Sequence, residues 1–121
     1  MKCIEEIQAW QKARELVREI YKTCRDGRLK SDFGLRDQIR RASVSSMSNI
    51  AEGFARKNDR EFARFLDIGK GSATEVQSLL YVALDVGYVT RDEFERLHKL
   101  AAEAASLISG LTTYLRRGLR E

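Results

Sequence analysis

The residues of this 121-residue chain best suited to chemistry with a partner are its arginines, which make up most of the 22 basic residues. The planar guanidinium group can donate two parallel hydrogen bonds, a geometry that matches phosphate oxygens. Arginines gather at two places in the middle of the chain and predict contacts with the phosphates of RNA or DNA. The candidate residues are Arg36, Arg40, Arg41, Arg56, Lys57, Arg60 and Arg64.

Acidic residues stand among these cations and allow a second interpretation. Asp37, Asp59 and Glu61 lie next to the candidate arginines in the sequence. A solvated helix surface, with ion pairs between successive turns, has the same mixed pattern. The formal net charge of +4 permits nucleic-acid binding without demonstrating it. A phosphate-binding patch and an ion-paired surface therefore both stay open.

A metal centre is the next chemistry to consider, because four-helix bundles can hold two iron ions. Such sites need glutamates on facing helices and a Glu-x-x-His pair on two of them. Glu52 and Glu75 are candidates for inward carboxylates, but the single histidine, His98, makes only one such pair, with Glu95. We expect no metal site and no cofactor, and we expect Glu95 and His98 on the solvent side of their helix.

Nucleophilic catalysis has equally little support. The serines at 43, 45, 46 and 48 lack the glycine-flanked elbow of a nucleophilic serine, and only one distant histidine is present as a base. The G-K-G-S stretch at 69–72 does not have the spacing of a phosphate-binding loop. Cys3 and Cys24 are too far apart in the sequence for a typical zinc motif, and Cys24 is expected to be a buried, reduced thiol. We therefore expect a protein without enzymatic activity.

The elements that would position these residues follow from the spacing of the apolar side chains. Apolar residues recur with a helical period in four segments, at about 4–24, 35–56, 59–86 and 90–119. Proline is absent, as an all-helical chain would explain. Short connections after the second and third segments predict antiparallel neighbours. The chain is thus expected to form one domain, residues 1–121, with an all-α, up-down antiparallel four-helix bundle.

Local signals predict where these helices end. Asn58 with Glu61, and Thr90 with Glu93, have the spacing of a capping box at a helix start. Gly27 and Gly87 suit the left-handed position after a helix. The serine-rich stretch 43–49 has low helix propensity, so it is either a break in the second helix or a helix held by packing.

Small and apolar residues in excess of one core face predict close packing and a subunit interface. Gly69 and Gly71, inside the third helix, suggest close helix contact. Further apolar side chains lie off the main stripes and predict an interface with other subunits. These residues are Val44, Met47, Ala51, Leu79, Tyr81, Val82 and Leu84. No apolar run reaches the length of a membrane span and no secretory signal is evident, so we expect a cytoplasmic protein.

Several motifs resemble one known family in order and spacing along nearly the whole chain. They are W-Q-K-A at 10–13, F-G-L at 33–35, Q-I-R-R-A at 38–42, S-N-I-A-E-G at 48–53, E-F-x-R-F-L at 61–66 and G-S at 71–72. This pattern is similar to the four-helix-bundle family named for the 23S rRNA intervening-sequence protein. The chain departs from it at Met47, where the family often has proline.

The resemblance implies a homopentameric ring of antiparallel bundles. It also implies kinship with the accessory variability determinant of diversity-generating retroelements, which binds a reverse transcriptase and nucleic acid. In this family Asn49 and Glu52 would be structural polar residues, bonded to Arg56 or Arg64. The resulting prediction is an oligomeric accessory protein that binds nucleic acid, and the alternative is a structural scaffold or protein-interaction module.

Overall fold

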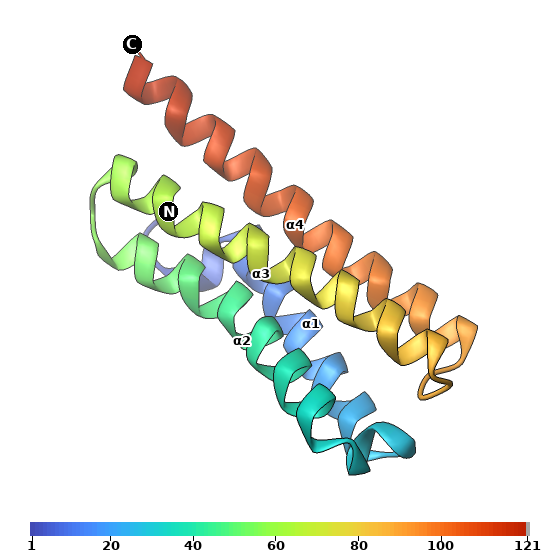
Figure 1. Cartoon of the computed structure of the whole chain (residues 1–121). Helices are drawn as coiled ribbons and strands as arrows, with labels where there is room; N and C mark the ends of the chain where they lie inside the picture. Colours follow the sequence, from blue (N-terminus) through green and yellow to red (C-terminus); the bar gives the residue numbers. More distant parts are fainter. Residues whose placement is uncertain (121) are drawn as a thin grey trace.

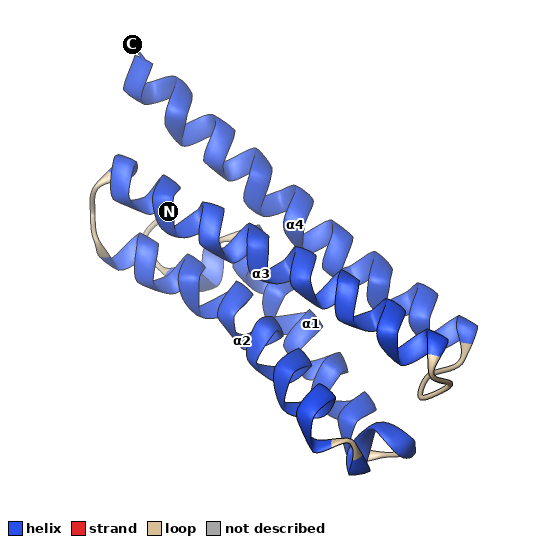
Figure 2. Cartoon of the chain, in the orientation of Figure 1, coloured by secondary structure: helices blue, strands red, loops and turns tan. Residues whose placement is uncertain are grey.

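The computed structural model describes residues 1–120, apart from the side chain of Arg120, and this part of the chain contains helices and no strand (Figures 1 and 2). There are four long helices and two short 3-10 helices, one before the first long helix and one between the first and the second. The elements are η1 (Ile4–Glu6), α1 (Gln8–Arg25), η2 (Arg28–Ser31), α2 (Phe33–Ala55), α3 (Asp59–Asp85) and α4 (Arg91–Arg120). Successive helices run in opposite directions, and α1 also packs on α4. The predicted all-α arrangement of four helices is confirmed.

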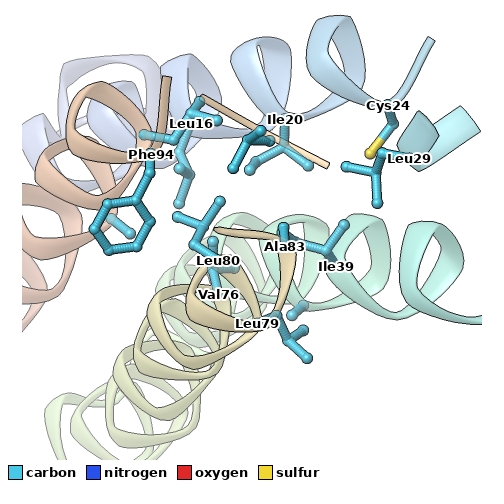
Figure 3. Packing of buried hydrophobic residues seen from close by; sticks show 14 residues of the cluster. Leu16, Ile20, Cys24, Leu29, Ile39, Val76, Leu79, Leu80, Ala83 and Phe94 are labelled. Carbon is cyan, nitrogen blue, oxygen red and sulfur yellow. The ribbon is translucent and has the colours of Figure 1, made fainter. Parts of the chain in front are cut away.

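The core is divided into two clusters along the bundle axis. One lies toward the α1–α2 and α3–α4 connections and takes residues from all four helices, among them Leu16, Ile39, Leu80 and Phe94 (Figure 3). The other lies toward the N-terminus and the α2–α3 turn and includes Trp10. Cys24 is buried in the first cluster as a free thiol, as predicted.

The serine-rich stretch is a continuous part of α2, so the alternative of a loop break is wrong. Ser43 and Ser46 are buried, and each hydroxyl donates to a carbonyl one turn back in its own helix, to Arg40 O at 2.9 Å and to Ser43 O at 2.6 Å. These bonds satisfy the buried hydroxyls without a loop. Tertiary packing therefore overrides the low helix propensity of the serines.

Two glycines allow α2 and α3 to approach closely. A Cβ atom on Gly53 would lie 2.8 Å from Phe65 Cβ and 2.9 Å from Phe62 Cδ1, a distance that real side chains do not tolerate. A Cβ on Gly69 would lie 3.3 Å from the carbonyl oxygen of Ser46. The close contact predicted for Gly69 is confirmed. That for Gly71 is wrong, since a Cβ there would meet nothing within 4 Å.

Of the two predicted capping boxes, the one at Thr90 forms both of its hydrogen bonds and the one at Asn58 forms one of the two. Thr90 Oγ1 accepts from the Glu93 N–H at 3.1 Å and Glu93 Oε1 accepts from the Thr90 N–H at 3.0 Å, which is a complete capping box. Asn58 Oδ1 accepts from the Glu61 N–H at 3.0 Å. The Glu61 carboxylate instead pairs with Arg64, because both are exposed one turn apart.

The two glycines predicted to end helices behave differently. Gly87, with φ of 79°, follows α3, and the Tyr88 N–H donates to Ala83 O at 2.8 Å, as in a Schellman motif. Gly27 also has a positive φ, but α1 has already ended at Arg25, and the backbone of Asp26 between them is extended. Gly27 therefore leads into η2, where Leu29 is buried in the core.

Some of the apolar residues that were predicted to form a subunit interface lie in the core instead. Met47 and Ala51 pack against the second core cluster, and Leu79 is buried in the first. Exposed apolar side chains do remain on α2 and α3. They are Phe33, Val44, Ile68, Tyr81 and Val82, and Val86 is exposed directly after α3.

Substitution of Gly53 by alanine should destabilise the protein, although alanine is ordinarily the better helix former. The new methyl group would force Phe62 and Phe65 aside, and overpacking of this kind costs about 1–3 kcal/mol in the free energy of unfolding. Gly71→Ala is the matched control, because its methyl group meets open space and should stabilise the helix by about 0.5–1 kcal/mol. Urea denaturation at equal chain concentration measures both. A Gly53→Ala variant as stable as Gly71→Ala would contradict the close α2–α3 contact.

An ion pair between α1 and α4 should make stability depend on pH. Glu19 Oε1 lies 2.6 Å from Arg96 Nη1, and Glu19 Oε2 lies 3.3 Å from Lys22 Nζ. Burial raises the pKa of Glu19, but the two cations outweigh burial and hold this pKa below its ordinary value. A carboxyl with a lowered pKa contributes stability that is present above its ordinary pKa and is lost as the pH falls through the pKa of the folded state.

We therefore expect Glu19→Gln to lower the denaturation midpoint near pH 7. The difference from the unsubstituted protein should shrink as the pH falls below about 5, because Glu19 then becomes neutral in both states. Denaturant titrations across this range provide the measurement. A difference that stays constant with pH would show that the carboxylate charge contributes nothing.

Candidate nucleic-acid interface

The structure separates the seven candidate cations into two groups at opposite ends of α2. The corner group is Arg36, Arg40 and Arg41, near the α1–α2 connection. The turn group is Arg56, Lys57, Arg60 and Arg64, around the turn from α2 to α3. At 1.5 Å per residue, about 30 Å of helix lies between Arg36 and Arg56. One copy of the chain therefore does not gather all seven on a single small patch.

In the turn group, two arginines cover one aromatic ring. The guanidinium carbons of Arg56 and Arg64 lie 5.0 and 4.8 Å from the centre of the Phe65 ring. Phe65 is only 7% exposed, since Gly53 lets it pack onto α2. Arg64 Nε also lies 2.8 Å from Glu61 Oε2, which lowers the pKa of Glu61 and raises that of Arg64.

The other two members of the turn group are exposed, and neither forms an ion pair within the described part of the chain. Lys57 has a positive φ of 54° at the end of α2, a conformation that a side chain normally disfavours. Arg60 lies in the first turn of α3. These two cations are the members of the turn group best placed for an external phosphate.

The end of α4 reaches the same end of the bundle (Figure 1). Arg116 Nη1 donates to Asp67 Oδ1 at 3.3 Å, and this carboxylate raises the pKa of Arg116. Arg117 is exposed beside it. Arg117 thus adds one exposed cation to this end of the bundle.

In the corner group, Arg36 is held in place. Its guanidinium carbon lies 4.7 Å from the centre of the Phe33 ring. Its Nη1 donates to the carbonyl of Lys30 at 3.1 Å and its Nε donates to Asp37 Oδ1 at 3.0 Å. These bonds hold the guanidinium in place, and its contact with the ring fixes the position of Phe33.

Arg40 and Arg41 face different surroundings. The Arg40 guanidinium lies 4.9 Å from the centre of the Tyr21 ring, and its Nε is buried without an acceptor among the described residues. Burial raises the pKa of the neighbouring Cys24 thiol, and Arg40 only partly opposes this effect. Arg41 is exposed and makes no ion pair within residues 1–119.

Sequence reasoning missed four residues at this corner. Arg28 and Lys30 are exposed cations on η2, held outward because Leu29 between them is buried. Phe33 and Tyr21 are aromatic residues at 64% and 40% exposure. An aromatic residue at the first position of α2, beside a run of cations, is the signal that could have found Phe33.

The carboxylates considered for a metal site point outward. Glu52 and Glu75 are exposed, and Glu75 accepts from Gln38 Nε2 at 3.3 Å, so their predicted inward position is wrong. Position 52 faces solvent because its neighbours Ile50 and Gly53 face the core. No group of three potential metal ligands occurs among the side chains that the structure describes.

The structure corrects the predicted positions and partners of other polar residues. His98 is half-buried beside the rings of Tyr81 and Phe94, at 5.4 and 5.2 Å between ring centres, whereas Glu95 is exposed as predicted. Asn49 Nδ2 donates to Ser45 O at 2.9 Å. The predicted bonds from Asn49 and Glu52 to Arg56 or Arg64 are wrong, because both arginines lie over Phe65.

These features define a basic four-helix bundle, and comparison with known proteins places it in a family. The 23S rRNA-intervening sequence protein family matches residues 5–110, and the chain belongs to this family. A crystal structure from Bacteroides thetaiotaomicron, of a protein with unknown function from the S23 ribosomal protein family, is similar with a TM-score of 0.78 and 23% identity. The match covers 86% of this chain and 97% of that one, and it supports the fold.

No functionally curated protein matches the chain. Within residues 1–120, the helices all fall short of the combined length and apolar character that a bilayer crossing requires.

Replacement of Lys57 by glycine should stabilise the protein while it weakens binding to phosphates. Glycine adopts a positive φ without steric cost, so we expect a gain of about 0.5–1 kcal/mol in the free energy of unfolding. Lys57→Ala is the matched control, since it removes the same charge but keeps Cβ, and its stability should equal that of the unsubstituted protein. Chemical denaturation would reveal the difference. Equal stability of the glycine and alanine variants would contradict a strained backbone at this position.

Proposed function

We propose that this protein binds RNA or DNA as a non-enzymatic, oligomeric accessory protein of the cytoplasm. The observation that carries the proposal is the state of the candidate cations. Within the described part of the chain, only Arg36 and Arg64 of the seven form an ion pair with an acidic side chain. The interpretation as an ion-paired surface requires partners for the others, whereas an external polyanion would supply them.

The remaining five candidates differ in how available they are. Arg40 and Arg56 lie over aromatic rings. Arg41, Lys57 and Arg60 are exposed without such a contact. Two free cysteines, Cys3 and Cys24, fit a reducing compartment.

The proposal includes assembly into a homopentameric ring. The exposed apolar side chains Val44, Ile68, Val82 and Val86 support burial against further copies, because such residues cost free energy in water. A ring would repeat each basic group, and several weak contacts on one polyanion strengthen binding beyond a single contact. A measured mass in solution tests the assembly directly.

A second candidate function is a structural scaffold or a docking module for a protein partner such as a reverse transcriptase. The exposed apolar residues of α2 and α3 favour it, since they suit a protein surface better than a phosphate backbone. Capture of one protein partner that survives nuclease treatment would favour this function over the first.

Affinity for nucleic acid should fall steeply with salt, and the slope should report the exposed cations. Removal of one phosphate-binding cation reduces the slope of log affinity against log salt by about 0.7 for single strands and 0.9 for duplexes. We expect Arg60→Gln to reduce the slope by about this amount for each subunit bound. Arg64→Gln is the matched control, since Arg64 is already paired with Glu61 and should change the slope less.

Fluorescence anisotropy with labelled RNA and DNA at several salt concentrations provides the measurement. No binding by the unsubstituted protein even at low salt would remove nucleic-acid binding as its function. A larger effect of Arg64→Gln than of Arg60→Gln would contradict the assignment of the free cations.

A further inference from the structure

Phe33 is exposed in an unusual way for an aromatic residue. Phenylalanine is normally among the most buried residue types, yet 64% of this side chain is accessible at the first position of α2. The Arg36 guanidinium lies over the ring at 4.7 Å and is itself tied to the Lys30 carbonyl and to Asp37. The ring is thus held in position and still offers surface to a partner.

A hollow adjoins this ring. It has a volume of about 660 Å³ and is lined by Arg28, Ser31, Asp32, Phe33, Gly34 and Tyr88. Phe33 and Tyr88 supply two aromatic side chains to one space, from α2 and from the α3–α4 connection. A flat aromatic ligand such as a nucleobase matches this lining.

The one carboxylate in the hollow is already engaged. Asp32 Oδ1 accepts from the Leu35 N–H at 3.1 Å, as the N-cap of α2, and Asp32 Oδ2 accepts from the Tyr88 hydroxyl at 3.0 Å. The same bond raises the pKa of Tyr88. Because both oxygens have donors, Asp32 holds Tyr88 at the hollow and presents less uncompensated charge to an incoming phosphate.

One cation lines the hollow, and two more lie near it along the chain. Arg28 lines it, Lys30 follows on η2, and Arg41 lies two turns along α2 from Phe33. All three are exposed, and none forms an ion pair within residues 1–119. The other acids within three residues of the lining in sequence are Asp26 and Asp85, which are exposed, and Asp37, which is paired with Arg36. Cations beside an exposed ring are the combination with which proteins bind single strands.

The turn group does not offer this combination. Its aromatic residue, Phe65, is 7% exposed and is covered by Arg56 and Arg64. Tyr114 on α4 is 69% exposed, but no guanidinium lies over its ring among the described residues. The two ends of the bundle therefore differ, although both are basic.

We propose that the corner around Phe33 binds a single-stranded segment of RNA or DNA, with one base stacked on Phe33 and the backbone near Arg28, Lys30 and Arg41. The inference rests on the proposed nucleic-acid binding and narrows it to one substrate class and one site. A duplex keeps its bases stacked inside, so only an unpaired base can reach the ring.

The test compares a labelled uridine oligonucleotide of about 12 residues with a duplex of equal length. Loss of one stacked base costs roughly 1–3 kcal/mol, so Phe33→Leu should weaken single-strand binding about 5- to 150-fold. Its affinity for the duplex and its salt slope should stay unchanged, because the substitution removes no cation. Phe33→Trp keeps a stacking surface and should retain single-strand binding.

Tyr114→Leu is the matched control, since it removes an equally exposed ring and should change neither affinity. Sedimentation equilibrium of each variant measures the mass of the assembly. Unchanged single-strand binding by Phe33→Leu, with binding by the unsubstituted protein intact, would overturn this inference and leave the proposed function standing.

Two further results would also overturn the inference. A smaller assembly mass for Phe33→Leu, with equal loss of single-strand and duplex binding, would show that the ring contacts a second copy of the chain. Absence of binding to either nucleic acid by the unsubstituted protein would remove the proposed function as well.

Discussion

The close approach of α2 and α3 at Gly53 and Gly69 is the constraint on which the arrangement of the bundle depends. A side chain at Gly53 would overlap Phe62 and Phe65, and one at Gly69 would press on the backbone of Ser46. The missing Cβ atoms set the register of the two helices. In this register the hydroxyls of Ser45 and Ser72 form a hydrogen bond of 2.8 Å. The small, serine-rich middle of α2 lies between the two core clusters.

Packing at each end of the bundle decides which cations are free. Phe65 packs onto Gly53, and its remaining face is covered by Arg56 and Arg64, so the turn end of the bundle presents cations over a buried ring. At the other end, burial of Leu29 turns Arg28 and Lys30 outward beside an exposed ring. The two basic ends therefore offer different surfaces, one with cations over a buried ring and one with cations beside an exposed ring.

Much of the fold could be predicted, because apolar spacing identifies four buried stripes, and the Thr90–Glu93 capping box and Gly87 mark helix ends by local chemistry alone. The helical spacing of apolar residues is less informative about burial at the edges of each apolar stripe. Glu52, Glu75 and Gly71 lie one or two positions from core residues, and only the packing of neighbouring helices decides that they face solvent. The candidate cations lie exposed or half-buried at the surface, and their pairing depends on side-chain conformations that spacing does not specify.

The central claim is that the corner of the bundle around Phe33 binds unpaired bases of a single strand. Ultraviolet crosslinking of a thiouridine-containing single strand to the unsubstituted protein, followed by mass spectrometry of the peptides, tests it most directly. The account predicts crosslinks within residues 28–41 that disappear when the strand is annealed into a duplex. Crosslinks confined to residues 56–64, or none above the level of the duplex, would contradict it.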